Sequence, residues 1–361
     1  SPSGVLQDAA QVLNAKAIPV RGYRLDGPYA VGDFNGDGHD DLVLLATKGS
    51  IPHVMSALCV MYGSVAGLLP ATSCLTFATG MTGFTAVGDI TGDHTDDLVI
   101  GIPSTKVGGD EFAGEVEILY GSRRGLAMTR RQILNPHAAG VLGPPPRPAE
   151  FGGAVALGDL NGDGRDDLIV GTSKSLNQDH GAATVSVYRG TASGITLRGR
   201  QLLTVASPGM PGPAAPAGGF GESLVAADFN GDGRADVAIG RPFLNGNGLT
   251  RAGVVDVLYG TGAGLSTRGS RQLTPLETGI TASGSAPDLE FGYGLTALPS
   301  TAGRTEDLIV SAAHTQFADE AGGKSWIITV PGSRSGIDPA RTQLLSATQV
   351  GADEIGTQFG S

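Results

Sequence analysis

Short apolar runs recur along the chain without the alternation of polar and apolar residues that a half-exposed strand shows. Each run follows a polar, glycine-containing loop. The runs are Leu42–Ala46, Leu98–Ile102, Leu168–Gly171 and Val237–Gly240. A continuous apolar run of this length is typical of a strand that is covered on both faces. The pattern therefore predicts buried strands, each belonging to a repeated unit.

A glycine-rich signature, G-[ST]-x-x-G-[LI], follows each apolar run after one more strand. It occurs within Tyr62–Leu68, Tyr120–Leu126, Arg189–Ile195, Tyr259–Leu265 and Pro331–Ile337. Glycine is suited to the positive φ of hairpin turns, so the signature predicts a hairpin between the third and fourth strands of a unit. The fourth strands then carry Arg131-Gln-Ile-Leu, Arg200-Gln-Leu-Leu, Arg271-Gln-Leu and Arg341-Thr-Gln-Leu-Leu.

The polar loop before each of the first four runs has the pattern D-x-N-x-D-G-x-x-D, with variations in the second copy. The copies are Asp33–Asp41, Asp89–Asp97, Asp159–Asp167 and Asp228–Asp236. Oxygen side chains at positions 1, 3, 5 and 9 of one tight loop can converge on a hard cation, and a glycine at position 6 permits the positive φ that folds the loop back. The alternative is a set of Asx turns. Four copies that share one ligand pattern favour calcium.

The spacing of the loops predicts the fold class. They begin at residues 33, 89, 159 and 228, and a fifth unit aligns at 299. Four-stranded units in tandem, each too thin to bury its own faces, indicate an all-β chain of four-stranded antiparallel blades, a β-propeller. A solenoid is the alternative. We expect one domain over residues 1–361, with repeats at 25–80, 81–150, 151–219, 220–290 and 291–358, an N-terminal strand at 10–14 and a partial repeat start at 359–361.

The fifth unit lacks the acidic loop. It keeps the second strand, Asp307–Ser311, but Pro299, Thr301 and Gly303 stand where the other units have their first three oxygen ligands. We expect no metal there.

The negative net charge of the chain is consistent with four metal-binding loops. The formal charge is −11, and the four loops hold twelve acidic residues at the ligand positions, three Asp in each loop. No Lys/Arg cluster is present that would indicate nucleic-acid binding, and no apolar run is long enough to span a membrane. The first residues carry no secretory signal, which is expected of a mature or trimmed chain.

Three motifs together resemble the FG-GAP repeats of the integrin α-subunit and of secreted bacterial integrin-like proteins. The first is Phe-Gly at the start of a unit, as in Phe151-Gly152 and Phe220-Gly221. The second is the acidic loop, and the third is Gly-x-Pro after the second strand, as in Gly101-Ile-Pro103 and Gly240-Arg-Pro242. The resemblance covers nearly the whole chain. It implies a calcium-bearing propeller, usually of seven blades, with the metal loops on one face and partner-binding loops on the other.

The resemblance also implies a ligand set for four Ca²⁺ ions. The side-chain ligands would be Asp33, Asn35, Asp37 and Asp41; Asp89, Thr91, Asp93 and Asp97; Asp159, Asn161, Asp163 and Asp167; and Asp228, Asn230, Asp232 and Asp236. The backbone carbonyls would come from His39, Thr95, Arg165 and Arg234. The Asp89–Asp97 site should be the weakest, because Thr91 replaces Asn and His94 replaces the glycine that adopts positive φ most readily.

The two cysteines are expected to form a disulfide. Cys59 lies three residues before Tyr62, and Cys74 lies seven residues after Gly67. Aligning the other units puts Glu117 and Gln132, then Ser186 and Gln201, in the same two positions, which should face each other across the hairpin. A bridge would agree with secretion.

Catalytic motifs are hard to find. His39, His53, His94, His137, His180 and His314 have no paired ligand spacing, and H-E-x-x-H, G-x-S-x-G and the phosphate-binding loop pattern do not occur. We therefore expect a secreted calcium-binding scaffold for adhesion, with no catalytic residues, that binds another protein or a cell-surface component through loops opposite the calcium loops. The regions 135–150, 204–219 and 241–250 are the candidates. A hydrolase or lyase on this fold, or the propeller appendage of one, is the alternative.

Closure of the ring is the last expectation. Ala10–Asn14 resembles the fourth-strand sequence Arg131–Asn135, although the fifth unit already has a fourth strand. Phe359-Gly360 opens a unit that does not follow. We expect the native chain to continue for one or two units, with Gln11–Asn14 completing the last blade. The alternative is that five blades close alone.

Overall fold

The computed structural model describes residues 18–50, 53–71, 74–77, 83–129, 131–138, 141, 150–172, 183–212, 217–246, 249–280, 289–300, 303–312 and 326–346. The segments 10–14 and 359–361, on which the expected ring closure depends, lie outside these residues. No helix in the described ranges is long and apolar enough to cross a membrane.

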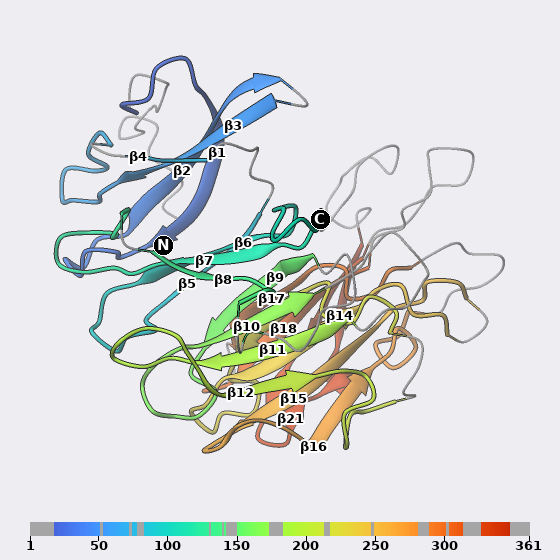
Figure 1. Ribbon diagram of the computed structural model, residues 1–361. Helices are drawn as coiled ribbons and strands as arrows, with labels where there is room; N and C mark the ends of the chain where they lie inside the picture. The colour runs from blue at the N-terminus through green and yellow to red at the C-terminus, as the bar shows by residue number, and fades with distance from the viewer. Residues whose placement is uncertain are drawn as a thin grey trace.

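The chain folds into five four-stranded antiparallel sheets, which confirms the β-propeller blades expected from the sequence (Figure 1). Blade one contains β1 (Arg24–Gly32), β2 (Asp41–Ser50), β3 (His53–Met61) and β4 (Cys74–Phe77), and blade two contains β5 (Phe84–Gly88), β6 (Asp97–Ile102), β7 (Glu115–Leu119) and β8 (Arg131–Leu134). Blade three contains β9 (Phe151–Gly158), β10 (Asp167–Thr172), β11 (Thr184–Arg189) and β12 (Thr196–Leu203). Blade four contains β13 (Leu224–Ala227), β14 (Asp236–Arg241), β15 (Val254–Thr261) and β16 (Gly264–Leu273), and blade five contains β17 (Leu295–Pro299), β18 (Glu306–Ala312), β19 (Trp326–Val330) and β22 (Gln343–Ser346).

Two small elements complete blade five. The strands β20 (Gly332–Ser333) and β21 (Gly336–Ile337) form the hairpin between β19 and β22, and a 3₁₀ turn covers Pro339–Arg341. The first strands of consecutive blades lie against each other: β1 against β5, β5 against β9, β9 against β13, and β13 against β17. Extensive contact between strands of blades one and five is absent among the described residues.

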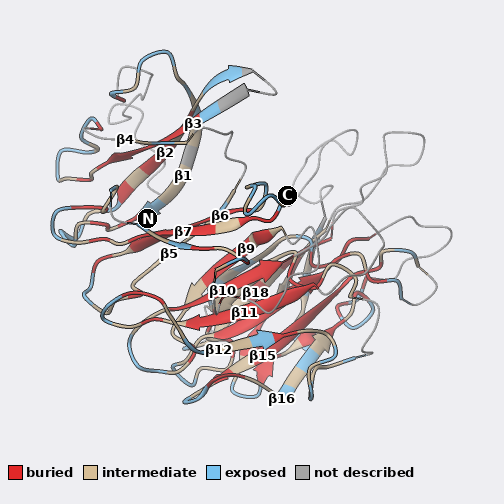
Figure 2. Cartoon of the chain, in the orientation of Figure 1, coloured by how far each residue is buried: buried red, intermediate tan, exposed pale blue. Residues whose placement is uncertain are grey.

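The hydrophobic core lies between blades rather than within them. Four clusters each fill the space between two consecutive blades. The second strands β6, β10 and β14 are buried along their whole length, as their unbroken apolar sequences predicted (Figure 2). Phe151, Phe220 and Phe291 of the Phe-Gly motifs are fully buried in these clusters, and each such burial stabilises the fold by about 1.5–3 kcal/mol.

The glycine of the Phe-Gly motif and the glycine of Gly-x-Pro are explained by one close approach. A Cβ at Gly101 would lie 2.2 Å from the carbonyl oxygen of Gly152 in the next blade, and a Cβ at Gly240 would lie 2.2 Å from that of Gly292. Heavy atoms cannot approach so closely without displacement of the backbone. These glycines therefore allow the first turn of each blade to pack closely against the second strand of the preceding blade.

The hairpin tyrosines join consecutive blades. The hydroxyl of Tyr62 accepts a hydrogen bond from the backbone N–H of Leu126 at 3.1 Å, and that of Tyr120 accepts one from Ile195 at 2.8 Å. Blade three has Arg189 at this place, and there the amide oxygen of Gln201 accepts the N–H of Leu265 at 2.9 Å. These tyrosines are structural.

The last Asp of each loop ties the loop to the hairpin. Asp41 accepts the N–H of Phe34 at 3.0 Å and that of Gly63 at 2.7 Å, and it is fully buried. The same tie to the first glycine of the hairpin signature joins Asp97 to Gly121, Asp167 to Gly190, Asp236 to Gly260 and Asp307 to Gly332. The tie persists in blade five, which lacks the Asp residues at positions 1 and 5, so this Asp serves the fold in its own right.

The first glycine of the hairpin signature is explained by this tie and not by positive φ. A Cβ at Gly63 would lie 2.3 Å from the carbonyl oxygen of Asp40. The second glycine has the positive φ that the sequence predicted, for example 102° at Gly67. The two glycines of the signature therefore have different physical roles.

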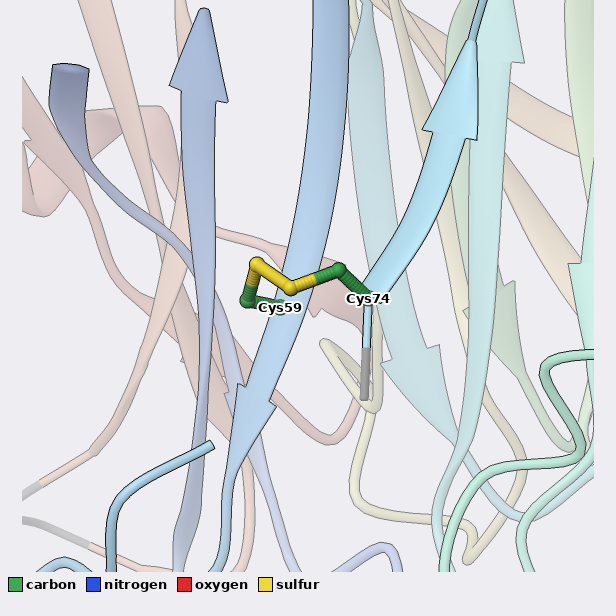
Figure 3. The surroundings of a disulfide bond; sticks show 2 residues. All are labelled: Cys59 and Cys74. Atoms are coloured by element: carbon green, nitrogen blue, oxygen red, sulfur yellow. A yellow bond between two sulfur atoms is a disulfide. The ribbon is translucent and has the colours of Figure 1, made fainter. Parts of the chain in front are cut away.

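Cys59 and Cys74 form the expected disulfide between β3 and β4 (Figure 3). The alignment of the other blades was wrong by one residue, because Glu117 pairs with Ile133 rather than Gln132. Ser186 likewise pairs with Leu202 rather than Gln201. The cysteine pair is 15 residues apart, whereas residues 117 and 133 are 16 apart, so the hairpin of blade one is one residue shorter.

Replacing both cysteines, C59A/C74A, should lower the free energy of unfolding by about 3 kcal/mol, since the bond closes a loop of 15 residues in the unfolded chain. Urea unfolding of the oxidised wild type and the double variant measures the difference. Equal midpoints and slopes for the two proteins would contradict the expectation.

Replacing Asp307 by Ala should leave the buried N–H of Gly332 without its acceptor and lower the free energy of unfolding by about 1–3 kcal/mol. Asp307→Asn keeps an acceptor oxygen and should recover most of this loss. Both effects should be the same with calcium and with chelator, because blade five lacks the loop. Thermal unfolding of the three proteins tests this, and an Asn variant as unstable as the Ala variant would argue against the hydrogen bond.

Candidate functional site: the acidic loops

The four acidic loops lie at equivalent places, each joining the first strand of a blade to the second. Asp33–Asp41 joins β1 to β2, and the loops of blades two, three and four join β5 to β6, β9 to β10 and β13 to β14. Because the blades share one topology, these loops and the hairpins lie at one end of the blades. The loops between second and third strands, and the connections between blades, lie at the other end.

Position 1 of each loop folds the backbone around its own carboxylate. Asp33 accepts the N–H of Asp37 at 3.1 Å and that of Gly38 at 2.8 Å. Asp89, Asp159 and Asp228 accept the N–H of position 6 at 2.8 Å in the same way. The loops therefore contain the Asx-type hydrogen bonds that were the alternative to a calcium site.

Position 6 has a positive φ in all four loops. The angle is 84° at Gly38, 80° at Gly164 and 82° at Gly233. It is 63° at His94, where a residue with a Cβ occupies the left-handed region at a cost of about 1–3 kcal/mol. The second loop is thus the strained one of the four.

Position 9 places a carboxylate in a buried, negatively charged environment. Burial raises the pKa of Asp41 to about 6 and the pKa of Asp97 to about 7, and Asp167 and Asp236 show pKa values of about 6 and about 7 for the same reason. Backbone N–H donors oppose this rise of the pKa at Asp97, while the charges of Asp89 and Asp93 add to it. A cation in the loop would oppose the same repulsion.

The donor chemistry of the loops fits a hard cation, since it consists of carboxylate, amide and hydroxyl oxygens. The side chains are not gathered at one point, however. Within the described ranges, which include all four loops, no group of three or more His, Cys, Asp or Glu side chains is arranged to hold a metal ion. Asn161 and Asn230 direct their amide nitrogens to Asp167 and Asp236 at 3.1 and 3.3 Å.

Position 5 is partly neutralised in two loops. Asp163 lies 3.7 Å from Arg165, and Asp232 lies 3.4 Å from Arg234. Both arginines occupy position 7, where only the backbone carbonyl was expected to take part. In all four loops position 5 also accepts the backbone N–H of position 7, for example Asp37 from His39 at 2.9 Å.

Position 8 was missed by the sequence analysis. Asp96 accepts the N–H of Asp33 from the preceding blade at 2.8 Å, and Asp166 accepts the N–H of Asp89 at 3.0 Å. An acidic residue at position 8 of three loops and at Glu306 was the available signal. It was not used because a contact between blades cannot be inferred from the pattern within one loop.

The opposite end of the blades carries exposed aromatic side chains. Phe112 is 52% exposed and Tyr293 is 44% exposed. The rings of Tyr293 and Phe243 meet edge to face with centroids 6.5 Å apart, and the guanidinium of Arg251 lies 4.4 Å from the centre of Phe243. These residues come from loops after second strands and from the start of blade five.

Comparison with known families identifies two of the blades directly. The FG-GAP repeat model matches residues 151–188 and 220–258. These segments contain the first two strands of blades three and four, the acidic loop between them, and the beginning of the third strand.

Several integrin alpha chains and phospholipases D are similar to about half of this chain. The chain is 29% identical to integrin alpha pat-2 of Caenorhabditis briggsae over 210 residues, which are 54% of this chain and 15% of the relative. It is 33% identical to phosphatidylinositol-glycan-specific phospholipase D of Bos taurus over 181 residues, or 50% of this chain and 20% of the relative. It is 29% identical to integrin alpha-5 of Xenopus laevis over 189 residues, or 52% and 16%. The matched region is thus a fifth or less of each relative. Together with the repeat match and the blades, these similarities show that the chain is an integrin-like FG-GAP repeat protein.

Proposed function

We propose that the chain is an extracellular calcium-binding propeller that presents a protein-binding surface. The observation that carries the calcium part is the recurrence of one loop, with three carboxylates and one further oxygen donor, in blades one to four. Blade five keeps the Asp that ties loop to hairpin but has Pro299 and Gly303 in place of the carboxylates at positions 1 and 5. These two carboxylates are therefore dispensable for the blade itself, which supports a separate purpose for them in the other four.

Calcium in these loops would be structural. Positions 1, 3, 5 and 9 would supply side-chain oxygens, and position 7 a backbone carbonyl. The ion would supply the positive charge that offsets three carboxylates crowded in a partly buried turn. The loop residues themselves hold the turn through the hydrogen bonds of position 1 and hold the hairpin through position 9.

Partner binding would use the end of the blades opposite the loops. Aromatic residues and arginine are enriched at protein interfaces, and Phe112, Tyr293 and Arg251 all lie in loops at this end of the blades. Integrin alpha chains among the relatives support a protein partner. The Cys59–Cys74 disulfide supports an extracellular location.

The enzyme alternative rests on relatives that are named phospholipase D. Because the match covers 20% of the Bos taurus relative, the chain would correspond to one part of such a protein. An assay of the full chain against phospholipid and glycosidic substrates separates the two proposals, and turnover would favour the enzyme.

Removing calcium should lower the melting temperature. A ligand that binds only the folded state stabilises it by RT ln(1 + [L]/Kd), which is about 2.7 kcal/mol for one site at a calcium concentration of one hundred times Kd. Calorimetry in calcium, in magnesium and in excess EDTA measures this. An unchanged melting temperature in EDTA, with no heat of calcium binding, would contradict the proposal.

Relieving the strained turn of the second loop should strengthen its site. His94→Gly removes a Cβ from the left-handed region and should tighten calcium binding about fivefold, which corresponds to about 1 kcal/mol. Gly164→His makes the reverse change in the third loop and should weaken binding there. Calcium titration of the two variants measures both changes in affinity. Changes in the same direction for the two variants would contradict the expectation.

The double variant F112S/Y293S should bind the partner less tightly, since it removes the exposed aromatic side chains and leaves the calcium loops unchanged. Val65→Ser is a matched control, because Val65 is 93% exposed in a hairpin at the loop end. Proteins captured by immobilised wild type are compared with those captured by the two variants, and affinities for each are then measured. Equal affinities for the wild type and F112S/Y293S would exclude this surface.

A further inference from the structure

The first residue of each acidic loop is held by the following blade. In the first loop, the N–H of Asp33 donates to the carboxylate of Asp96 at 2.8 Å. The carbonyl oxygen of Asp33 accepts the N–H of Asp96 at 3.0 Å. Both backbone groups of the proposed first ligand are therefore fixed by one acidic residue from blade two.

The same pair of contacts recurs between later blades. Asp166 of blade three accepts the N–H of Asp89 at 3.0 Å and donates its own N–H to the carbonyl of Asp89 at 2.8 Å. Glu306 of blade five makes both bonds to Asp228 at 2.8 Å. Three loops are thus held in one way by residues that belong to a neighbouring unit.

The third loop is the exception. Ala235 of blade four donates its N–H to the carbonyl of Asp159 at 2.9 Å, but it has no carboxylate to accept the N–H of Asp159. The two hydrogen bonds together form a clamp in the other three loops, and only one of them is present at this junction.

A glycine before each of the first two clamped loops makes room for the acid. A Cβ at Gly32 would lie 2.8 Å from the carboxylate of Asp96, and a Cβ at Gly88 would lie 2.1 Å from that of Asp166. The third loop keeps a glycine, Gly158, at this place, where a Cβ would lie 2.7 Å from the Cβ of Ala235 and 2.9 Å from the Cβ of Ala226.

We propose that Asp96, Asp166 and Glu306 are positioning residues for the calcium loops of the preceding blades. This inference rests on the calcium binding proposed above. A loop whose first ligand is already fixed loses less conformational freedom when it closes on an ion. The free energy of calcium binding is more favourable by that difference. Each of these sites therefore depends on two blades, although its ligands come from one.

Asp96→Ala should weaken one calcium site, that of the first loop, about tenfold, because it removes a charge-assisted hydrogen bond from the first ligand. Asp96→Asn keeps an acceptor oxygen and should restore most of the affinity. Asp40→Ala is the matched control, since Asp40 has the same position in blade one, is exposed, and its side chain accepts no hydrogen bond from a described residue. It should leave all sites unchanged.

Ala235→Asp provides the opposite test in case the Asp96 variants fold poorly. The new carboxylate would extend from the Ala235 Cβ, which lies beside Gly158, and should accept the N–H of Asp159. The third site should bind calcium about tenfold more tightly. The variant gains a function rather than losing one, so misfolding cannot imitate the expected result.

Calorimetric titration of metal-free protein with calcium measures both the number of sites and their affinities. The expected result is four sites in the wild type, one weakened in Asp96→Ala, four intact in Asp96→Asn and Asp40→Ala, and one strengthened in Ala235→Asp. Four wild-type sites with Asp96→Ala and Ala235→Asp both unchanged would overturn the positioning role. A wild type without calcium binding would instead overturn the proposed function on which the role rests.

Discussion

A buried carboxylate at the end of each loop is the interaction on which each blade depends. Asp41, Asp97, Asp167 and Asp236 are almost completely buried, and each binds the N–H of the first hairpin glycine. This bond joins the beginning of the second strand to the end of the third. A buried donor or acceptor without a partner costs about 1–3 kcal/mol. The hydrogen bond therefore holds the hairpin glycine close to the loop, and this close approach is possible because the glycine has no Cβ. Loop, hairpin and sheet are consequently fixed as one unit.

Contacts between blades repeat as regularly as contacts within them. The phenylalanine of the Phe-Gly turn, the hairpin tyrosine and the acid at position 8 each reach from one blade to the next. Tandem units that contact only their neighbours gain stability from each interface in turn. The acidic loops lie at the end where two of these contacts are made, so an ion bound to a loop would act on an interface as well as on a turn.

Much of this structure could be predicted from the sequence, because the repeats make each residue visible several times. The five blades, the left-handed residue at position 6 and the Cys59–Cys74 bond follow from motifs of fixed spacing. The pairing of Glu117 was wrong by one residue, since one hairpin is shorter and no motif marks the difference. The tie made by position 9 and the clamp made by Asp96 were not foreseen, because both join residues that are distant in sequence. The role of position 9 in the fold also shows why a ligand pattern alone cannot separate metal binding from hydrogen bonding.

The most direct test of calcium binding is a crystal structure of the protein grown with calcium and measured at a wavelength where calcium scatters anomalously. The account predicts anomalous peaks within the loops 33–41, 89–97, 159–167 and 228–236, with the lowest occupancy in the second. It predicts no peak near residues 299–307, where the carboxylates at positions 1 and 5 are missing. Loops without peaks at saturating calcium, with the hydrogen bonds of position 1 unchanged, would contradict it.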